Sequence, residues 1–123
     1  MIYLLYFIVR SINSNNGRGN KMKMDSDKAT LICKALGDLN RMSIVQILTG
    51  GERCACELLE SLDITQPTLS YHMKILEQCQ LVTSRDDWRN TYYSLDCDTW
   101  KSFKKFIENI SCICDSNENC SNY

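Results

Sequence analysis

The sequence predicts a mainly α-helical domain with a small β-hairpin, and two observations lead to this fold class. Between residues 25 and 111, apolar residues recur at three- and four-residue steps in successive segments, which is the spacing of amphipathic helices. Ahead of the last segment, two short runs with strand character flank a polar stretch, as in a hairpin. The 123 residues, 44% apolar and 24% charged, are ordinary for one globular domain with its own core.

Two helices open the domain. The first is predicted over residues 25–36 and ends at Gly37. The second begins with Asn40 as its N-cap and is closed by Gly50 and Gly51. We expect their inward faces to be Ala29, Ile32 and Leu36 in the first helix, and Ile44, Val45 and Leu48 in the second.

A helix-turn-helix follows these two helices. A third helix begins near Cys54, and residues 63–64 form the turn. Residues 65–67 (Thr-Gln-Pro) open a fourth helix, since proline is tolerated in the first turn of a helix. The buried faces are predicted to be Ala55, Leu58, Leu59 and Leu62 in the third helix, and Leu69, Met73 and Leu76 in the fourth.

The outer face and flanks of the fourth helix carry hydroxyl, phenol, ammonium and imidazole groups, which suit DNA base edges and phosphates. An ordinary solvated helix surface explains this pattern equally well when the helix is considered alone. We take this helix as a candidate recognition helix. Its candidate DNA contacts are Thr65, Gln66, Thr68, Ser70, Tyr71, His72 and Lys74.

The predicted strands are residues 81–84 and 91–95, and a hairpin directly after a helix-turn-helix is a wing. The fold class is therefore a winged helix-turn-helix. Arg85 and Arg89 in the intervening loop are candidate phosphate contacts, although two neighbouring aspartates would repel the DNA backbone if they faced it. The formal net charge of −1 neither supports nor excludes DNA binding.

A final helix is predicted over residues 98–111. Its large apolar residues form one stripe that we expect to be buried: Trp100, Phe103, Ile107 and Ile110. Two burial partners remain open at this point. One is the core of the same chain, and the other is a second copy of the chain, in which case α-helical dimerisation elements lie at both ends of the domain.

Residues 1–24 form an apolar and linker-like extension ahead of the domain. Residues 1–9 are apolar but far shorter than a membrane span, and no positively charged region precedes them, so we expect no membrane association. An alternative is that translation starts at Met22 or Met24. At the other end, residues 112–123 form a polar tail that contains Cys112, Cys114 and Cys120.

Eight cysteines are many for a chain of this length. The spacing of Cys54 with Cys56, and of Cys112 with Cys114, is too tight for an ordinary bridge within each pair, which argues against a secreted disulfide framework. We expect a cytoplasmic protein with free thiols. Three further cysteines are expected to be small core residues, because free cysteine buries readily: Cys33, Cys79 and Cys97.

The motif of two cysteines ahead of a helix-turn-helix carries a family resemblance. Residues 52–58 (ERCACEL) and 64–76 (ITQPTLSYHMKIL), together with the strand residues 81–82 and 93–95, closely resemble the ArsR/SmtB winged-helix repressors, especially arsenical-resistance repressors. The resemblance covers roughly residues 25–111. It implies a homodimer that binds double-stranded operator DNA without a cofactor and represses its operon until a toxic metal or metalloid binds and releases the DNA.

Three positions depart from the family pattern. Leu59 stands where the best-known arsenical repressors have a third cysteine, and Gln80 and Trp88 replace the usual glycines before the wing and within it. Zinc and nickel sensors of this family use aspartate and histidine ligands on the final helix, whereas the one histidine here is His72. Zinc sensing is therefore disfavoured, and a cysteine-only site is expected.

The resemblance makes Cys54 and Cys56 the metal ligands, with As(III) or Sb(III) as inducer, because these soft ions prefer three thiolates. Side chains two residues apart on an ideal helix point roughly 200° apart, so we expect ion binding to distort the helix start and tilt the recognition helix. Additional candidate ligands are Cys112, Cys114 and Cys120.

Four other functions remain open. A repressor of the same fold would respond to thiol oxidation or to Cd/Pb rather than to a metalloid. A thiol oxidoreductase or a metal buffer without a DNA role is the least favoured. The chain lacks a Cys-x-x-Cys motif, a βαβ pattern and an evident acid-base pair around the thiols, so we expect no enzyme.

Overall fold

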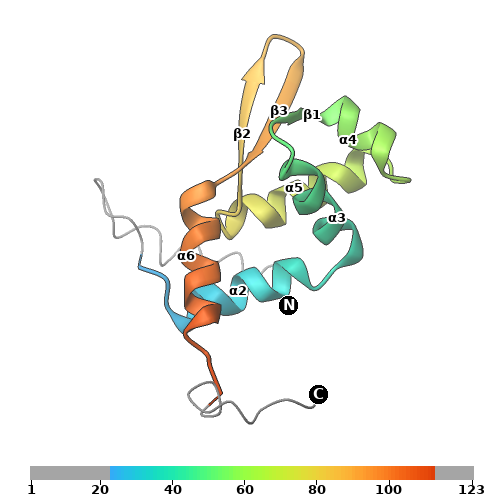
Figure 1. The fold of residues 1–123 in the computed structure, drawn as a ribbon. Coiled ribbons are helices and arrows are strands. Elements are labelled where there is room, and N and C mark those ends of the chain that lie inside the picture. The colour runs from blue at the N-terminus through green and yellow to red at the C-terminus, as the bar shows by residue number, and fades with distance from the viewer. Residues whose placement is uncertain (1–22, 113–123) are drawn as a thin grey trace.

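The structure is a computed structural model that describes residues 23–112. Within these residues, five helices and three short strands follow one another (Figure 1). They are α2 (Ser26–Leu36), α3 (Leu39–Leu48), β1 (Arg53–Cys54), α4 (Ala55–Ser61), α5 (Gln66–Gln78), β2 (Val82–Asp87), β3 (Asn90–Leu95) and α6 (Cys97–Glu108). The order confirms the predicted mainly helical winged helix-turn-helix.

Local side-chain caps define where the helices begin. Asp25 caps α2 by accepting a hydrogen bond from the backbone N–H of Lys28 at 2.9 Å. The expected cap of the second helix was wrong: Asp38, not Asn40, accepts from the backbone N–H of Arg41, at 3.1 Å, and α3 starts two residues earlier than predicted. An aspartate two positions upstream offers the same capping oxygen, and the chain is extended there.

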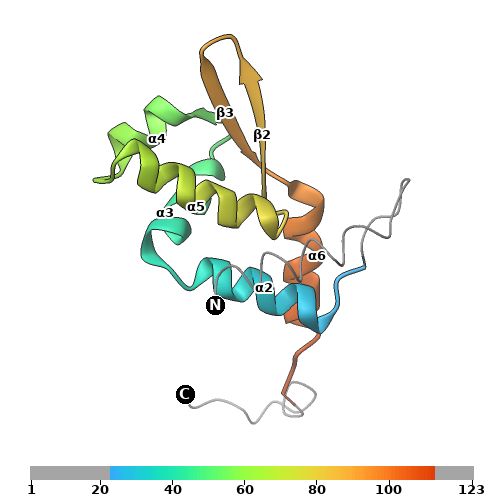
Figure 2. The same ribbon diagram turned by 180° about the vertical axis from the view of Figure 1, so that it is seen from behind.

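The core lies where α2, α3, α4 and α5 meet the base of the wing. Figures 1 and 2 show α5 crossing the domain above α2, with α6 upright beside α2. Within the described residues, the largest side chains with almost no exposure are Ile32, Ile44, Leu58, Leu69, Met73, Leu76 and Leu81. The predicted inward faces of these helices are confirmed at these positions, while Leu36, Ala55, Leu59 and Leu62 are only partly buried against the core.

The wing belongs to a three-stranded antiparallel sheet with the order β1-β3-β2. β2 and β3 pair from Val82 with Leu95 to Asp87 with Asn90, so the strands are longer than predicted and only Trp88 and Arg89 form the turn. The third strand was not anticipated. This strand, β1, has only two residues, Arg53 and Cys54, which pair with β3, and a two-residue strand carries no recognisable period.

The final helix α6 begins at Cys97 and ends at Glu108, and Asp96 is its N-cap. The expectation that its whole apolar stripe is buried was wrong for the isolated chain. Phe103 is buried, but Ile107 is 42% and Ile110 is 71% exposed. Nothing in the described part of the same chain covers this end of the stripe, so burial there requires another surface.

No helix in residues 23–112 is long and apolar enough to cross a membrane. The predicted extension, residues 1–24, and the predicted cysteine tail, residues 112–123, lie outside the described residues except for Lys23, Met24 and Cys112. Of the two alternative starts, Met22 lies outside the described residues and Met24 lies within them.

Candidate DNA-binding surface and thiol pair

The candidate recognition helix is α5, and its N-terminus is built from its own polar side chains. Thr65 is the N-cap, its hydroxyl lies 2.9 Å from that of Thr68, and Gln66 donates to Ser70 at 3.4 Å. These contacts arrange the first turn of α5 while Thr65, Gln66 and Ser70 stay exposed. Hydroxyl and amide groups held in this way are available for base edges and phosphates.

Further along α5, the exposed groups are an aromatic ring and a cation. Tyr71 and Lys74 are both exposed, and Tyr71 retains 46% of its surface. Thr68 is only partly exposed. The predicted outer face of the helix is therefore present at these positions, and it continues from the polar first turn.

His72 departs from the expected placement on an open flank of α5. It is buried, with 6% exposure, and its Nδ1 lies 3.1 Å from Nη1 of Arg41 and 3.9 Å from a carboxylate oxygen of Asp38. The reason is tertiary. Arg41 extends from α3 toward α5 and hydrogen-bonds an imidazole that would otherwise be buried without a partner, so His72 does not belong to the exposed face of α5.

Of the two arginines predicted to contact phosphate, Arg85 lies in β2, and its side chain already has partners within the same chain. Its guanidinium binds the Glu52 carboxylate at 2.6 and 2.9 Å, approaches Asp87 at 3.5 Å and lies 4.4 Å from the ring centre of Tyr92. The hydrogen bond from Arg85 holds the pKa of Glu52 below its ordinary value, and Glu52 in turn raises the pKa of Arg85.

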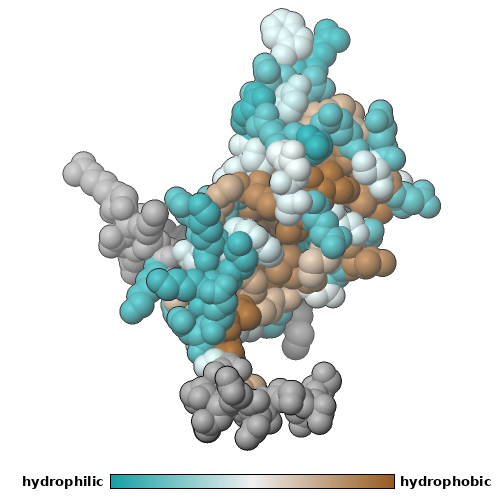
Figure 3. All heavy atoms as spheres, in the orientation of Figure 1, coloured by the Kyte–Doolittle hydropathy of each residue, from teal (hydrophilic) through white to brown (hydrophobic). Residues whose placement is uncertain are grey.

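The wing rises from the domain with a largely hydrophilic surface, whereas apolar side chains gather on the face below it (Figure 3). Arg89 is exposed beside Trp88 in the turn. Trp88 is 92% exposed and has a φ of 61°, and Gln80, before the wing, has a φ of 62°. Both positions where the family pattern has glycine therefore adopt the left-handed conformation that favours glycine.

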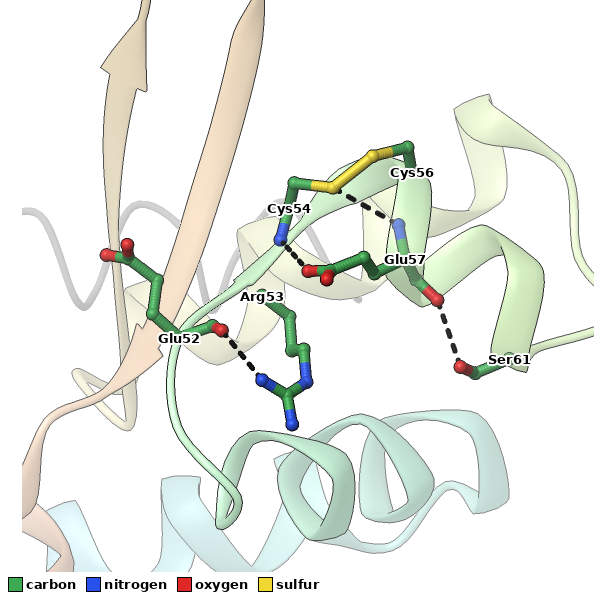
Figure 4. Close-up of a disulfide and its surroundings, with 6 residues drawn as sticks. All are labelled: Glu52, Arg53, Cys54, Cys56, Glu57 and Ser61. Carbon is green, nitrogen blue, oxygen red and sulfur yellow. Dashed lines mark hydrogen bonds between the residues drawn. A yellow bond between two sulfur atoms is a disulfide. The ribbon is translucent and has the colours of Figure 1, made fainter.

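Cys54 and Cys56 meet at the start of α4, where they form a disulfide with a Cα–Cα distance of 5.3 Å (Figure 4). The prediction that this spacing is too tight for a bridge was wrong, and so was the expectation that a regular helix start keeps the two sulfurs apart. Cys54 is the N-cap and has an extended backbone, with φ −76° and ψ 157°. Because Cys54 lies outside the helix, the 200° separation of helical side chains does not apply.

A reciprocal capping box surrounds the pair. The Cys54 sulfur accepts from the backbone N–H of Glu57 at 3.3 Å, and the Glu57 carboxylate accepts from the backbone N–H of Cys54 at 2.8 Å. Sequence reasoning missed Glu57 as part of the site. The signal was present, because a cysteine followed three residues later by glutamate is a capping box with sulfur in place of a hydroxyl.

The remaining cysteines do not join this pair within the described residues. Cys33 and Cys97 are exposed, so their prediction as core residues was wrong, whereas Cys79 is buried as expected, and burial raises the pKa of its thiol. Cys112 is exposed, and Cys114 and Cys120 lie outside the described residues. Residues 23–112 contain no cluster of three side chains able to hold a metal ion, consistent with Leu59 at the position of a third sulfur.

Comparisons with known proteins place this arrangement in context. The family model described as bacterial regulatory protein, arsR family, matches residues 38–84, from the cap of α3 into β2. The arsenical resistance operon repressor of Staphylococcus aureus is 39% identical over 97 residues, which make up 79% of this chain and 90% of that protein. The repressor of the same description from Staphylococcus xylosus is 37% identical over 80% of this chain and 91% of its own. Among solved structures, HlyU from Vibrio cholerae matches with a TM-score of 0.60 and 26% identity, covering 72% of this chain and 98% of that one.

Proposed function

Because this chain belongs to the arsR family of bacterial regulatory proteins, we propose that it is an operon repressor that binds operator DNA as a homodimer and is released by As(III) or Sb(III). Cys54 and Cys56 are the proposed ligands. The observation that carries the proposal is the placement of this pair: both sulfurs meet at the N-cap of α4, the helix that precedes the recognition helix α5.

In their reduced form, two sulfurs that approach closely enough to bond need only a small side-chain rotation to share one soft ion. A helix N-terminus stabilises negative charge, and the first-turn backbone N–H of Glu57 is directed at the Cys54 sulfur at 3.3 Å. In Figure 1 the C-terminal end of α6 lies at the opposite end of the domain from α4, and Cys112 comes four residues after that end, so Cys112 of the same chain is poorly placed to supply a third sulfur. We therefore propose a two-sulfur trigger, with the tail cysteines as the alternative source of a third ligand.

DNA binding is assigned to the exposed surface of α5 and to the wing. The groups offered to DNA are Thr65, Gln66, Thr68, Ser70, Tyr71 and Lys74 on the helix, and Arg85 and Arg89 on the wing. A homodimer is supported by the exposed apolar residues Ile107, in the last turn of α6, and Ile110, just after it, which have no cover within the described chain. Two recognition helices would then face two half-sites of one operator.

Release is proposed to begin at the helix cap. Ligation draws the sulfur of Cys54 away from the N–H of Glu57, so the capping box weakens and the start of α4 shifts. Because α4 packs against α5, a displaced α4 changes the seating of the recognition helix on DNA.

A DNA-binding titration with and without arsenite tests the proposal. Under reducing conditions, Cys54→Ser and Cys56→Ser are expected to bind the upstream region of the gene as the wild type does, yet to stay bound when arsenite is added. Cys33→Ser is the matched control, since Cys33 is an exposed free thiol on α2, and it should release normally. Normal release by both test variants would exclude the assigned ligands, and failure of the reduced wild type to bind DNA specifically would exclude the repressor.

Simultaneous replacement of Cys112, Cys114 and Cys120 by serine separates the two ligand sets. Under the two-sulfur proposal, this triple variant releases DNA with arsenite as the wild type does. Weakened release assigns the third sulfur to the tail.

A thiol-redox repressor is the second candidate function, and the disulfide between Cys54 and Cys56 favours it. In that case, hydrogen peroxide would take two electrons and two protons from the pair, forming the disulfide and two waters, and DNA would be released without any metalloid. Titration with peroxide in the absence of arsenite distinguishes the two functions.

A further inference from the structure

The segment that leads into the thiol pair is tied to the wing by one carboxylate. Glu52 accepts two hydrogen bonds from Arg85 on β2, at 2.9 and 2.6 Å, and a third from the hydroxyl of Ser94 on β3, at 3.2 Å. Cys54 follows only two residues later. Glu52 thus connects both long strands of the wing to the short segment that ends in the thiol pair.

The backbone makes a second connection at the same place. β1 consists of Arg53 and Cys54, which pair with Tyr93 and Tyr92 of β3. Tyr92 also pairs with Arg85, and the Arg85 guanidinium lies over the Tyr92 ring. Tyr92 is therefore flanked in the sheet by Cys54 on one side and by Arg85 on the other.

Cys54 belongs to two elements at once. It is the last residue of β1 and the N-cap of α4, so any displacement of its backbone on ligand binding acts on the sheet as well as on the helix. Figure 4 shows Glu52 directed toward the wing strands and the disulfide at the other end of the same short segment. A two-residue strand has few backbone hydrogen bonds, which makes the Glu52 side chain a major part of its attachment to the wing.

From this geometry we infer that Glu52 is a positioning residue that transmits the ligand state of Cys54 and Cys56 to the wing through Arg85 and Ser94. Metalloid binding then acts on DNA through two contacts, the recognition helix and the wing. Since Arg85 is the wing cation held by Glu52, a shift of β1 also moves a proposed phosphate contact. The inference rests on the proposed function and adds to it a route of coupling.

The quantity that tests the inference is the coupling ratio, which is the DNA dissociation constant with arsenite divided by that without it. Couplings of this kind typically lie between about 5-fold and 150-fold. Glu52→Gln keeps the shape of the side chain and removes its charge, and Ser94→Ala removes only the third hydrogen bond. Glu60→Gln is the matched control, because Glu60 is an exposed carboxylate on α4 without an ion pair in the described part of the chain.

For Glu52→Gln we expect arsenite to bind with wild-type affinity while the coupling ratio falls by about 5-fold or more, and for Ser94→Ala a smaller fall in the same direction. Glu60→Gln should keep the wild-type ratio. Amide hydrogen exchange of residues 82–95 should rise on arsenite addition in the wild type and respond less in Glu52→Gln. This readout separates coupling from a general loss of structure, which would raise exchange even without arsenite.

Three outcomes are informative. Retained arsenite binding with a reduced ratio in Glu52→Gln supports the inference. Equal ratios in the wild type, Glu52→Gln and Ser94→Ala overturn the inference and leave the proposed function intact. A wild type that binds DNA but is not released by arsenite overturns both, because there is then no signal to transmit.

Discussion

Arg41 and His72 are hydrogen bonded, with 3.1 Å between Nη1 of the guanidinium and Nδ1 of the imidazole, and this contact joins α3 to the recognition helix. A guanidinium only donates hydrogen bonds, so Nδ1 of His72 accepts and the neutral ring carries its proton on Nε2. Arg41 also donates from Nε to the carbonyl of Ala35 at 2.6 Å. The single histidine of the chain therefore acts in the packing of the recognition helix.

Replacing His72 should lower stability rather than change DNA specificity. His72→Ala leaves a part-buried Arg41 donor without its partner and opens a cavity, so we expect a loss of about 1 to 3 kcal/mol in the free energy of unfolding. Urea denaturation measures it. Ser70→Ala, at an exposed position two residues earlier, should change stability by no more than about 0.5 kcal/mol. Wild-type stability combined with lost DNA binding in His72→Ala would instead identify a direct DNA contact.

Lys74 is expected to contact a phosphate. Lys74→Ala should weaken binding to all DNA sequences alike, and the slope of log affinity against log salt should fall in magnitude by about 0.9. Fluorescence anisotropy at several salt concentrations gives this slope. Lys34→Ala, at an exposed position on α2, is the control and should leave the slope unchanged. An unchanged slope in Lys74→Ala would remove that residue from the interface.

Replacing Trp88, the turn residue with a left-handed backbone, by glycine should stabilise the fold. Its φ of 61° forces the Cβ of a non-glycine residue into unfavourable contact, and its side chain is 92% exposed. Trp88→Gly is therefore expected to raise the free energy of unfolding by about 0.5 to 1 kcal/mol, measured in urea. Arg89→Gly is the matched control, because Arg89 lacks a positive φ, and it should not stabilise. A decrease for Trp88→Gly would mean that the indole stabilises the turn by packing.

Gln80 has a φ of 62°, and Gln80→Gly should raise the free energy of unfolding by less than Trp88→Gly does. The side-chain amide oxygen Oε1 of Gln80 accepts from Nζ of Lys28 at 2.8 Å, and glycine loses this hydrogen bond between α2 and the start of the wing.

Oxidation is expected to keep the protein on DNA and to make it insensitive to arsenite. With the disulfide formed, the capping box of α4, the pairing of β1 with β3 and the cap of α5 are all in place. The same two sulfurs are then unable to bind an ion until two electrons and two protons restore the thiols. The check is to titrate DNA-bound, oxidised protein with arsenite, before and after adding a reductant, and to measure how much DNA is released. DNA release on oxidation alone would favour the redox repressor.

Asp38 should stabilise the fold in a pH-dependent way. The backbone N–H of Arg41 is the first cause that holds the pKa of Asp38 below its ordinary value of 3.8. Because the folded-state pKa is the lower one, this stabilisation is complete above the unfolded-state pKa and is lost as the pH falls through the folded-state value. Asp38→Ala should cost about 1 kcal/mol at neutral pH. Urea denaturation at about pH 7 and about pH 3 should show the difference shrinking in acid; a constant difference would contradict the capping role.

The sequence by itself determined the helices, the turn between them and the wing, because these depend on local patterns. Apolar residues at steps of three and four predict that Leu58, Leu69 and Met73 lie on the inward faces of their helices, and all three are buried. The position of the Cys-x-Cys motif at the start of a helix could also be predicted, since both features lie within a few consecutive residues.

Tertiary structure decided the features that depend on distant partners. Cys54 meets Cys56 because its pairing with Tyr92 holds it in an extended conformation outside α4. His72 is buried because Arg41, 31 residues earlier, reaches it. Arg85 is bound because Glu52, 33 residues away, lies across the sheet. Burial and ion pairing are set by which elements pack together, and the period of a single helix or strand does not contain that information.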